Sequence, residues 1–327
     1  MLACRFALLP GDAGMDLRNG VHNALGIALG LVTVASFGIL VSRTLEMDGG
    51  AWGTLFTDMG VALKVTHFGH IWRWRVPALA LAWLAYAWSL RHRRAWATWL
   101  VVIAIAAIAL TRSDTGHPAD HGDFTAAVWV DWLHLLSAGT WVGSLFGMTL
   151  VVFPRLLRAG RPGLGLNAEV FQRLSTLSGV ALAVVVGAGI YNAITQLGGF
   201  AGLWTSRYGI TLDVKLAIVI AMIAFGAHNR YVKLPRLLHA SGGRARWGPF
   251  AAIVRASAGS PDAGPVDGAA VVRACARAVL IEAVLGLIVI GATANLIHAT
   301  PPGDRPPQGA SGSMVSQAAM PRLTRVA

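Results

Sequence analysis

Long apolar stretches alternate with short polar segments along the whole chain. A membrane-spanning helix needs roughly 20 mostly apolar residues, and seven stretches approach or exceed that length. They lie near residues 21–41, 72–90, 95–111, 126–152, 174–197, 210–229 and 274–298. The pattern predicts an all-α, polytopic membrane helical bundle with about seven transmembrane helices.

The polar segments between these stretches differ in charge. Lys and Arg concentrate in alternate segments, around 91–94, 155–173 and 230–273. Cytoplasmic segments of membrane proteins carry such an excess, so the N-terminus is expected inside and the C-terminus outside. The net charge of +12 is then a topology signal. We therefore expect contacts with membrane lipids and no nucleic-acid partner.

Composition predicts four parts of the chain. Residues 1–18 are expected to form a short cytoplasmic tail, and 19–125 a three-helix membrane region with an outer interfacial segment. Residues 126–302 are expected to form a four-helix membrane domain, and the Pro- and Gly-rich residues 303–327 a disordered outer tail. Between helices, residues 230–272 read as a long inner loop.

Glycine spacing suggests two local features. Phe68-Gly69 is followed six residues later by Arg75, and Tyr208-Gly209 is followed six residues later by Lys215. This weak repeat predicts a glycine turn that feeds a helix, with a long cation reaching the headgroups. Small residues spaced by four let helix backbones approach closely, and one stretch carries such a series at Gly139, Gly143 and Gly147.

Histidines gather on the predicted outer side, which holds six of the ten. Imidazole and carboxylate groups bind transition metals. The fourth stretch opens with Asp131-Trp-Leu-His134, and positions i and i+3 share a helix face. An ionisable pair inside a membrane is costly and suggests function. The carboxylate could orient the imidazole toward a metal, or both groups could only link helices.

The candidate metal ligands extend from this pair into the outer polar segments. A solvated loop or headgroup contacts would explain the same residues without metal. The candidates are His134, Asp131, His117, His121, Asp120, His67, His70 and His298. Polar or soft side chains inside the predicted spans could line a pathway, or could only pack and bond helices together. These are Met148, Asn192, Met222 and Glu282.

The remaining chemistry-bearing residues suggest no further site. His22 is on the predicted inner side and is expected at the surface. Cys4 and Cys275 are both inner and no CxxC occurs, so neither a disulfide nor a thiolate metal centre is expected. The chain has no Walker loop, no GxSxG and no HExxH. We therefore expect no enzyme activity and no organic cofactor.

The chain resembles the copper resistance protein D (CopD) family. The segment Asp131-Trp-Leu-His134-Leu-Leu-Ser-Ala-Gly-Thr-Trp141-Val-Gly143 is similar to the helix that opens the CopD domain. Later landmarks follow in order: Gly189-Ile-Tyr191-Asn192, Tyr208-Gly209 with Lys215, His228-Asn229-Arg230, Glu282 through Gly286, and Thr300-Pro-Pro302. The resemblance covers about 126–302, and Phe68-Gly69 through Arg75 is similar to the N-terminal half of longer members. Those members usually have eight spans, and this chain is expected to lack the first.

The resemblance implies a copper-handling protein of the bacterial inner membrane. Together with the outer histidines it predicts that copper, as Cu(I) or Cu(II), is received at a periplasmic His/Asp rim and imported towards the cytoplasm. It also implies a periplasmic copper carrier of CopC type as a partner. Two other functions fit the sequence: a membrane haem-b redox protein with axial histidines, and an assembly factor that hands copper to a membrane enzyme without transport.

Overall fold

The computed structural model describes residues 1–10, 14–47, 49–50, 52–92, 95–116, 122–158, 164–197, 207–241 and 268–297. These residues are almost all helical and include no strand. The elements are η1 (Cys4–Leu8), α1 (Met15–Met47), α2 (Leu55–Val65), α3 (His67–His92), α4 (Ala95–Ser113), α5 (Ala126–Gly147), η3 (Met148–Val152), α6 (Phe153–Arg158), α7 (Leu164–Leu197), α9 (Arg207–His228), η5 (Asn229–Lys233), α10 (Leu234–Ala240) and α12 (Gly268–Ile297). Each predicted span falls on one of them.

Six of the described helical segments are long and apolar enough to cross a membrane. They contain α1, α4, α5 with η3 and α6, α7, α9 with η5 and α10, and α12. The prediction of an all-α, multi-pass membrane protein is therefore confirmed. Helix α3 corresponds to the remaining predicted span, at 72–90, but it carries Arg73 and Arg75 near its start. Its crossing of the membrane stays a prediction.

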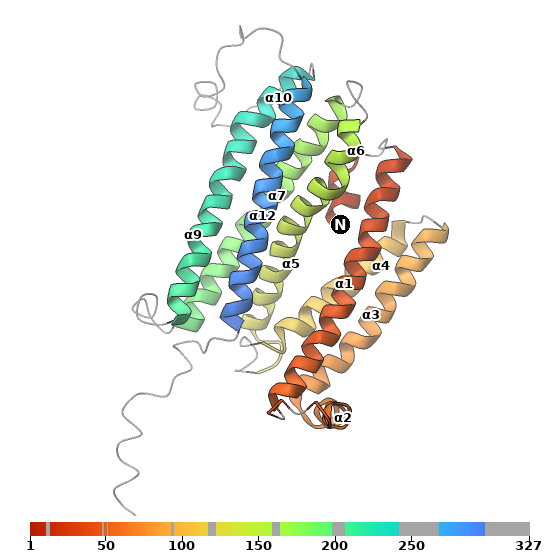
Figure 1. Ribbon diagram of the computed structural model, residues 1–327, viewed down its shortest axis with the longest axis vertical. Coiled ribbons are helices and arrows are strands. Elements are labelled where there is room, and N and C mark those ends of the chain that lie inside the picture. The colour runs from red at the N-terminus through yellow and green to blue at the C-terminus, as the bar shows by residue number, and fades with distance from the viewer. Residues whose placement is uncertain are drawn as a thin grey trace, which may run out of the picture.

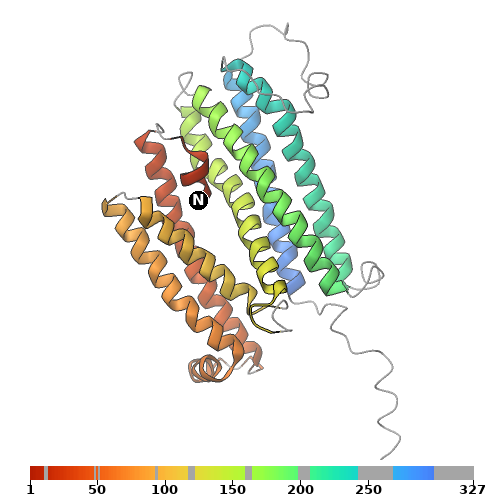
Figure 2. The same cartoon turned by 180° about the vertical axis from the view of Figure 1, so that it is seen from behind.

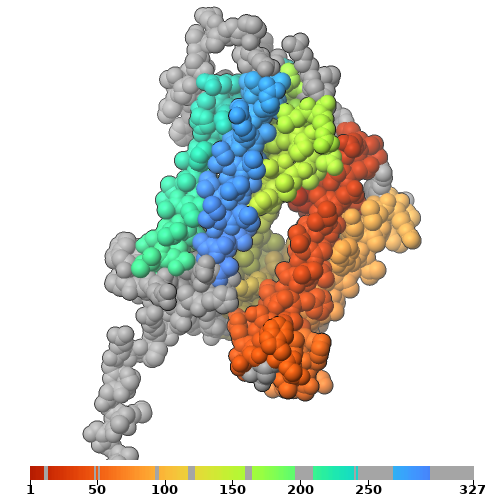
Figure 3. All heavy atoms as spheres, in the orientation of Figure 1, coloured from red at the N-terminus to blue at the C-terminus, as the bar shows by residue number. Residues whose placement is uncertain are grey.

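The helices form two groups that lie side by side (Figures 1 and 2). Helices α1, α3 and α4 form the first, and α5, α7, α9 and α12 form the second. Helix α4 packs on α5, and η1 lies against both α1 and α7. On the face shown in Figure 3, a hollow separates α1 from α5 and α12. The groups thus meet along α4–α5, where α1 contacts η3, and through the N-terminal segment.

The two ends of the bundle differ in charge. The end that carries α6 and α10 holds Arg155, Arg158, Arg173, Arg230 and Arg236, and we call it the basic end. The opposite end carries α2 (Figure 1), and we call it the α2 end. Most of the described acidic residues lie towards this end, including Glu46, Asp58, Asp114, Asp123 and Asp213. This division agrees with the predicted alternation of basic segments.

Segments read as inner loops and tail contain more helix than expected. In place of a loop at 154–173, α6 continues from η3 and α7 begins at Leu164. In place of a loop that begins at 230, η5 and α10 extend α9. Within the expected tail, η1 is folded and Cys4 and Leu8 are fully buried. These basic segments lack the apolar length for a span of their own, but their residues continue or begin the neighbouring long helices.

In the region of the expected outer interfacial segment, α2 ends at Val65 and α3 begins at His67. Thr66 forms the corner, and its Oγ1 accepts a hydrogen bond from Gly69 N at 2.9 Å. A Cβ added at Gly69 would lie 2.1 Å from the Ala62 carbonyl oxygen. Glycine is therefore required here because the start of α3 touches the backbone of α2.

The glycine series on α5 does not form the expected helix-packing face. A Cβ added at Gly139 or Gly143 would meet nothing within 4 Å. Only Gly147 is crowded, and its neighbours are the sulfur atoms of Cys4 and Met1. The close approach is therefore made by the N-terminal segment and not by another long helix.

Candidate functional site

Helix α5 carries Asp131 and His134 near the α2 end. The helix starts after Thr125, whose side chain accepts a hydrogen bond from Val128 N and so satisfies one of the free amides of the first turn. His134 lies about 12 Å along the helix from Ala126 at ~1.5 Å rise per residue. Both side chains are half-buried. The predicted shared face is therefore present, within the outer third of the span.

The carboxylate of Asp131 joins three helices. Ser113 Oγ, at the last residue of α4, donates to Asp131 Oδ2 at 2.7 Å. Asn192 Nδ2, on α7, donates to Asp131 Oδ1 at 3.3 Å. Both oxygens of a costly buried carboxylate are thus satisfied, and Asp131 is held in a defined position between α4 and α7.

The imidazole of His134 is oriented by α7. Its Nδ1 lies 3.1 Å from the carbonyl oxygen of Val185, and a carbonyl can only accept. Nδ1 therefore carries the proton, and Nε2 keeps the lone pair that a metal would bind. The expectation that Asp131 orients the imidazole is wrong, because Val185 does so.

A glycine on α7 lies directly beside this contact. The Val185 carbonyl already accepts the helical bond from the residue four positions later, which is Gly189. A Cβ added at Gly189 would lie 3.4 Å from His134 Cε1 and 3.7 Å from Nδ1. The imidazole therefore lies on the bare backbone of α7.

Basic side chains surround the pair. Lys215 on α9 interacts electrostatically with both Asp131 and His134, and Arg112 on α4 interacts with Asp131. The expectation that the repeat cations reach headgroups is wrong for Arg75, which is 2% exposed and donates through Nε to Thr111 Oγ1 at 2.8 Å. The repeat thus places its cations towards the interior of the bundle.

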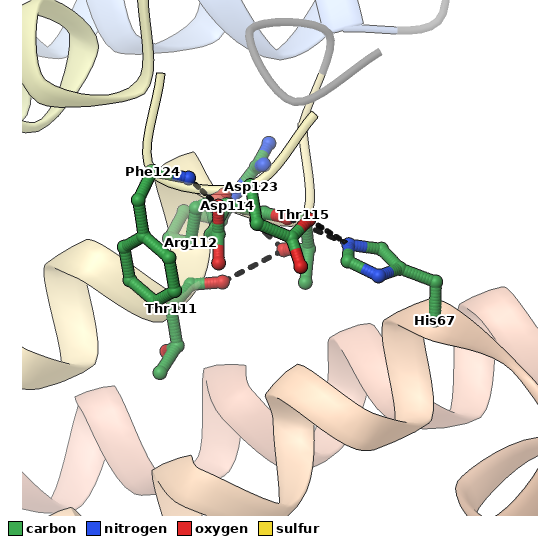
Figure 4. A network of polar contacts seen from close by, with 7 residues as sticks. All are labelled: His67, Thr111, Arg112, Asp114, Thr115, Asp123 and Phe124. Atoms are coloured by element: carbon green, nitrogen blue, oxygen red, sulfur yellow. Dashed lines mark hydrogen bonds and ion pairs between the residues drawn. The ribbon is translucent and has the colours of Figure 1, made fainter. Parts of the chain in front are cut away.

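A second polar network lies at the α2 end (Figure 4). His67, the first residue of α3, places Nε2 3.3 Å from the Asp114 carbonyl oxygen and 3.4 Å from Asp123 Oδ1. The Asp114 side chain is 1% exposed and accepts a hydrogen bond from Phe124 N at 3.2 Å. His67 therefore links α3 to the segment between α4 and α5, whose sequence contains three of the other predicted ligands, His117, Asp120 and His121.

The other predicted ligands divide into two sets. His70 is exposed and its Nδ1 lies 2.5 Å from Arg73 Nη2, so it does not join His67. The remaining candidates, His117, Asp120, His121 and His298, lie outside the described residues. Within the described residues, no group of three or more His, Cys, Asp or Glu side chains could hold a metal ion.

The pathway candidates occupy several depths of the second group. Asn192 belongs to the Asp131 network. Glu282 on α12 is 4% exposed and accepts a hydrogen bond from Asn229 Nδ2. Met222 on α9 is buried, and its Cε would lie 3.5 Å from a Cβ added at Gly286. Met148 is fully buried in the core beside the N-terminal segment.

His22 was expected at the surface, and the structure buries it. Its side chain stacks on Tyr86 at a ring-centroid distance of 4.8 Å, and it lies at the basic end of α1. His134 lies in the α2-end third of α5. A haem-b site requires two axial histidines at matched depth on facing helices, and the described buried pair does not meet this requirement.

Sequence reasoning missed three partners of the candidate site. Ser113 is the last residue of a helix and carries no distinguishing pattern. The Val185 carbonyl is a backbone group, and only Gly189 four residues later marks it. Lys215 was found through the repeat but was assigned to the headgroups. Hydropathy identifies spans, but it does not tell which face of a span meets which neighbour.

Comparison with known proteins assigns the family. Residues 168–296 match the family described as Copper resistance protein D. Residues 2–127 match the family described as Copper resistance protein D-like, N-terminal domain. No solved structure matches the chain significantly. The two matches cover one region in each of the two helix groups.

Three curated relatives are similar over most of the chain. Copper resistance protein D of Pseudomonas syringae pv. tomato is 30% identical over 64% of this chain and 67% of its own length. Inner membrane protein YebZ of Escherichia coli is 30% identical over 64% and 72%. Copper transport protein CutJ of Bacillus subtilis is 27% identical over 61% of this chain, which spans only 37% of that relative.

These relatives agree with the predicted location, a multi-pass position in the bacterial inner membrane. The chain is 30% identical to the Pseudomonas and Escherichia proteins and covers at least two thirds of each of them. This similarity shows that the three proteins belong to one family. The chain belongs to the copper resistance protein D family.

Proposed function

We propose that this chain handles copper in the bacterial inner membrane, receiving the ion at the α2 end and passing it towards the basic end. The α2 end would face the periplasm, because basic segments favour the cytoplasm. The observation that carries the proposal is the orientation of His134. Its Nδ1 is committed to the Val185 carbonyl, so Nε2 is left as a metal ligand beside the carboxylate of Asp131.

The receiving rim would combine this pair with the histidines of the α2 end. His67 is already next to Asp123, two residues after His121 in sequence. In the proposal, His117, Asp120 and His121 complete the rim with His67, while His70 and His298 lie at its margin. A periplasmic carrier of CopC type would supply the copper, and the function would need no catalytic residue and no organic cofactor.

Movement beyond the rim would use weaker ligands in sequence, because a single tight cage would not release the ion. Met222 and Glu282 are buried near mid-depth, where α9 meets α12. Met148 lies further towards the basic end of the second group. A thioether suits Cu(I), and a buried carboxylate would offset the charge of the ion.

Lys215 gives the site a way to hold its shape without copper. Its ammonium group interacts with Asp131 and His134. In the absence of copper, the lysine therefore supplies the positive charge that a bound copper ion would otherwise supply. Copper would have to displace this interaction. The competition favours weak, reversible binding, which is what a transport site needs.

The test is copper accumulation in intact cells that express each variant at the same level in the membrane. His134→Ala is expected to reduce accumulation strongly, and His92→Ala, an exposed histidine at the basic end, is the matched control. Equal accumulation in both variants would remove His134 from the function.

Two further outcomes separate the alternatives. If the purified protein binds copper but wild-type cells accumulate none, hand-off to a membrane enzyme replaces import. If the purified protein shows the visible absorption bands of haem b, the redox alternative replaces both.

A further inference from the structure

The N-terminal segment brings two sulfur atoms into the interior of the bundle, between the two helix groups (Figures 1 and 2). Met1 and Cys4 are three residues apart on a helical turn, in which Arg5 N donates to the Met1 carbonyl at 3.1 Å. Positions i and i+3 lie on one face of a helix. Cys4 is fully buried and Met1 is partly buried against the same core. The thioether and the thiol therefore enter the interior together.

Both sulfur atoms lie against the bare backbone of Gly147, the last residue of α5. The neighbours of a Cβ added at Gly147 would be Cys4 Sγ and Met1 Sδ, the second of them at 3.4 Å. Met148 directly follows Gly147 and is fully buried in the core that contains Cys4. One thiol and two thioethers thus meet where α5 continues into η3.

The thiol is bonded in a way that leaves its sulfur available. Cys4 Sγ donates to the carbonyl oxygen of Ser144 at 4.0 Å, which is a weak bond that uses the proton and no lone pair of the sulfur. The thioethers of Met1 and Met148 have no proton to donate. Thiolate and thioether sulfur are the protein ligands that select Cu(I).

The helical segments at this point are unusual. Cys4 begins η1 and Met148 begins η3, and both segments are π-helical. Turns of this kind are rare and frequently occur at functional sites. Met148 also follows His134 on one continuous helical segment, about 21 Å further along at ~1.5 Å per residue. The sulfur atoms therefore lie towards the basic end of the same segment that carries the proposed rim.

We propose that Met1 and Cys4, with Met148 beside them, bind Cu(I) at the inner end of the copper path. This inference rests on the proposed function and adds the site from which a cytoplasmic acceptor takes the ion. The bound metal replaces the thiol proton, which passes to water. Because its ligands are sulfur, this site prefers Cu(I) over Cu(II), whereas the rim offers imidazole and carboxylate groups. No thiolate centre was expected because Cys4 and Cys275 form no CxxC pair, but thioethers replace the second thiol here.

The experiment titrates Cu(I), in the absence of oxygen, into the purified full chain against a coloured Cu(I) chelator of known affinity. The His134→Ala background is used so that copper at the rim does not contribute. Adding Cys4→Ser is expected to weaken binding by about 100-fold or more, because it removes a ligand where supporting contacts alone are worth 10–100-fold. X-ray absorption at the copper edge should show sulfur neighbours before this change and fewer after it.

Cys275→Ser in the same background is the matched control. Cys275 is also fully buried in the same core, but it interacts with the cation Lys233. The control is expected to bind Cu(I) with unchanged affinity and unchanged sulfur neighbours. Equal affinity of the Cys4→Ser and Cys275→Ser proteins would overturn the proposal.

A second pair of variants tests the position of the site. Gly147→Ala places a methyl group where the two sulfur atoms meet, and it is expected to lower Cu(I) affinity roughly tenfold, as for the loss of a supporting contact. Gly143→Ala is the control, because a Cβ there would meet nothing within 4 Å. Elution profile and helical circular dichroism check the fold. Full affinity in a folded Gly147→Ala protein would show that Cu(I) does not bind at this junction.

Failure of this proposal is distinguishable from failure of the proposed function. Normal Cu(I) binding by Cys4→Ser, together with lost copper accumulation in His134→Ala cells, would keep the rim and remove the sulfur site. Sulfur-bound copper that depends on Cys4, together with normal accumulation in His134→Ala cells, would keep the sulfur site and remove the rim.

Discussion

His134 and His22 are both imidazoles inside long helices, yet their hydrogen bonds place the ring proton on different nitrogen atoms. His134 donates from Nδ1 to a backbone carbonyl and keeps a lone pair on Nε2. His22 accepts at Nδ1 from Arg5 and donates from Nε2 to Ser89, so both nitrogens are used. Burial alone therefore does not identify a metal ligand; the hydrogen-bond partner of each ring nitrogen does.

The largest expected effect is on copper affinity. His134→Ala should weaken binding of copper to the purified protein by about 100-fold or more, because it removes a ligand whose supporting contacts alone are worth 10–100-fold. His22→Ala should leave the affinity unchanged. Titration with Cu(I) and Cu(II) separately gives the comparison. A similar loss from both substitutions would show that the two histidines are not distinguished in this way.

The stability of the fold should depend on His22, which is not expected to affect copper affinity. His22→Ala should lower the free energy of unfolding by about 2 kcal/mol, because Ser89 and Arg5 lose their partner and Tyr86 loses its stacked ring. Asn23→Ala, an exposed neighbour on α1, is the control. Thermal unfolding in detergent measures both. An unchanged midpoint for His22→Ala would mean that this relay contributes nothing to the fold.

Gly189→Val tests the support of His134 without touching the ligand itself. Branched carbons at this position would push the imidazole off the Val185 carbonyl, and copper affinity should fall roughly tenfold, as for other losses of a ligand's supporting contact. Gly187→Val is the matched control, since a Cβ added there would meet nothing within 4 Å. If the two valine variants bind copper equally well, the carbonyl does not set the tautomer.

The smallest expected effect is an increase in copper affinity. Lys215→Gln removes the cation that competes with copper at Asp131 and His134, so affinity should rise about fivefold, a modest like-charge term. Lys64→Gln removes the same charge from an exposed position at the α2 end and should change little. Weaker binding in Lys215→Gln would assign the lysine a supporting role in place of a competing one.

The contrast between His134 and His22 also shows which features could be predicted from the sequence. Spans followed from apolar length, and the Asp131–His134 face followed from helical spacing. The distinction between His134 and His22 did not, because it depends on Val185 and Arg5, which lie 51 and 17 residues away. His22 lies at the start of the first predicted span and was assigned to the surface, because neither Tyr86 nor Ser89, which contact it, is near it in sequence.

The prediction of loops in the basic segments was also wrong in part. Residues 164–173 carry Asn167, Glu169 and Arg173, which made them read as an inner loop, yet α7 starts at Leu164. Charged residues end an apolar run without ending a helix, since Glu169 and Arg173 form an i, i+4 pair at 2.6 Å that supports it. Hydropathy locates the membrane boundary, and hydrogen bonding locates the helix end.

The N-terminal segment has a consequence for biosynthesis. Cys4 Sγ lies 4.0 Å from the Ser144 carbonyl, and Arg173 donates to the Leu9 carbonyl at 3.5 Å. A chain is made from its N-terminus at roughly 5–20 residues per second. The residues around Cys4 therefore emerge long before α5 and α7 and must wait for them. Docking of this segment therefore follows the synthesis of α5 and α7, although η1 precedes both helices in the chain.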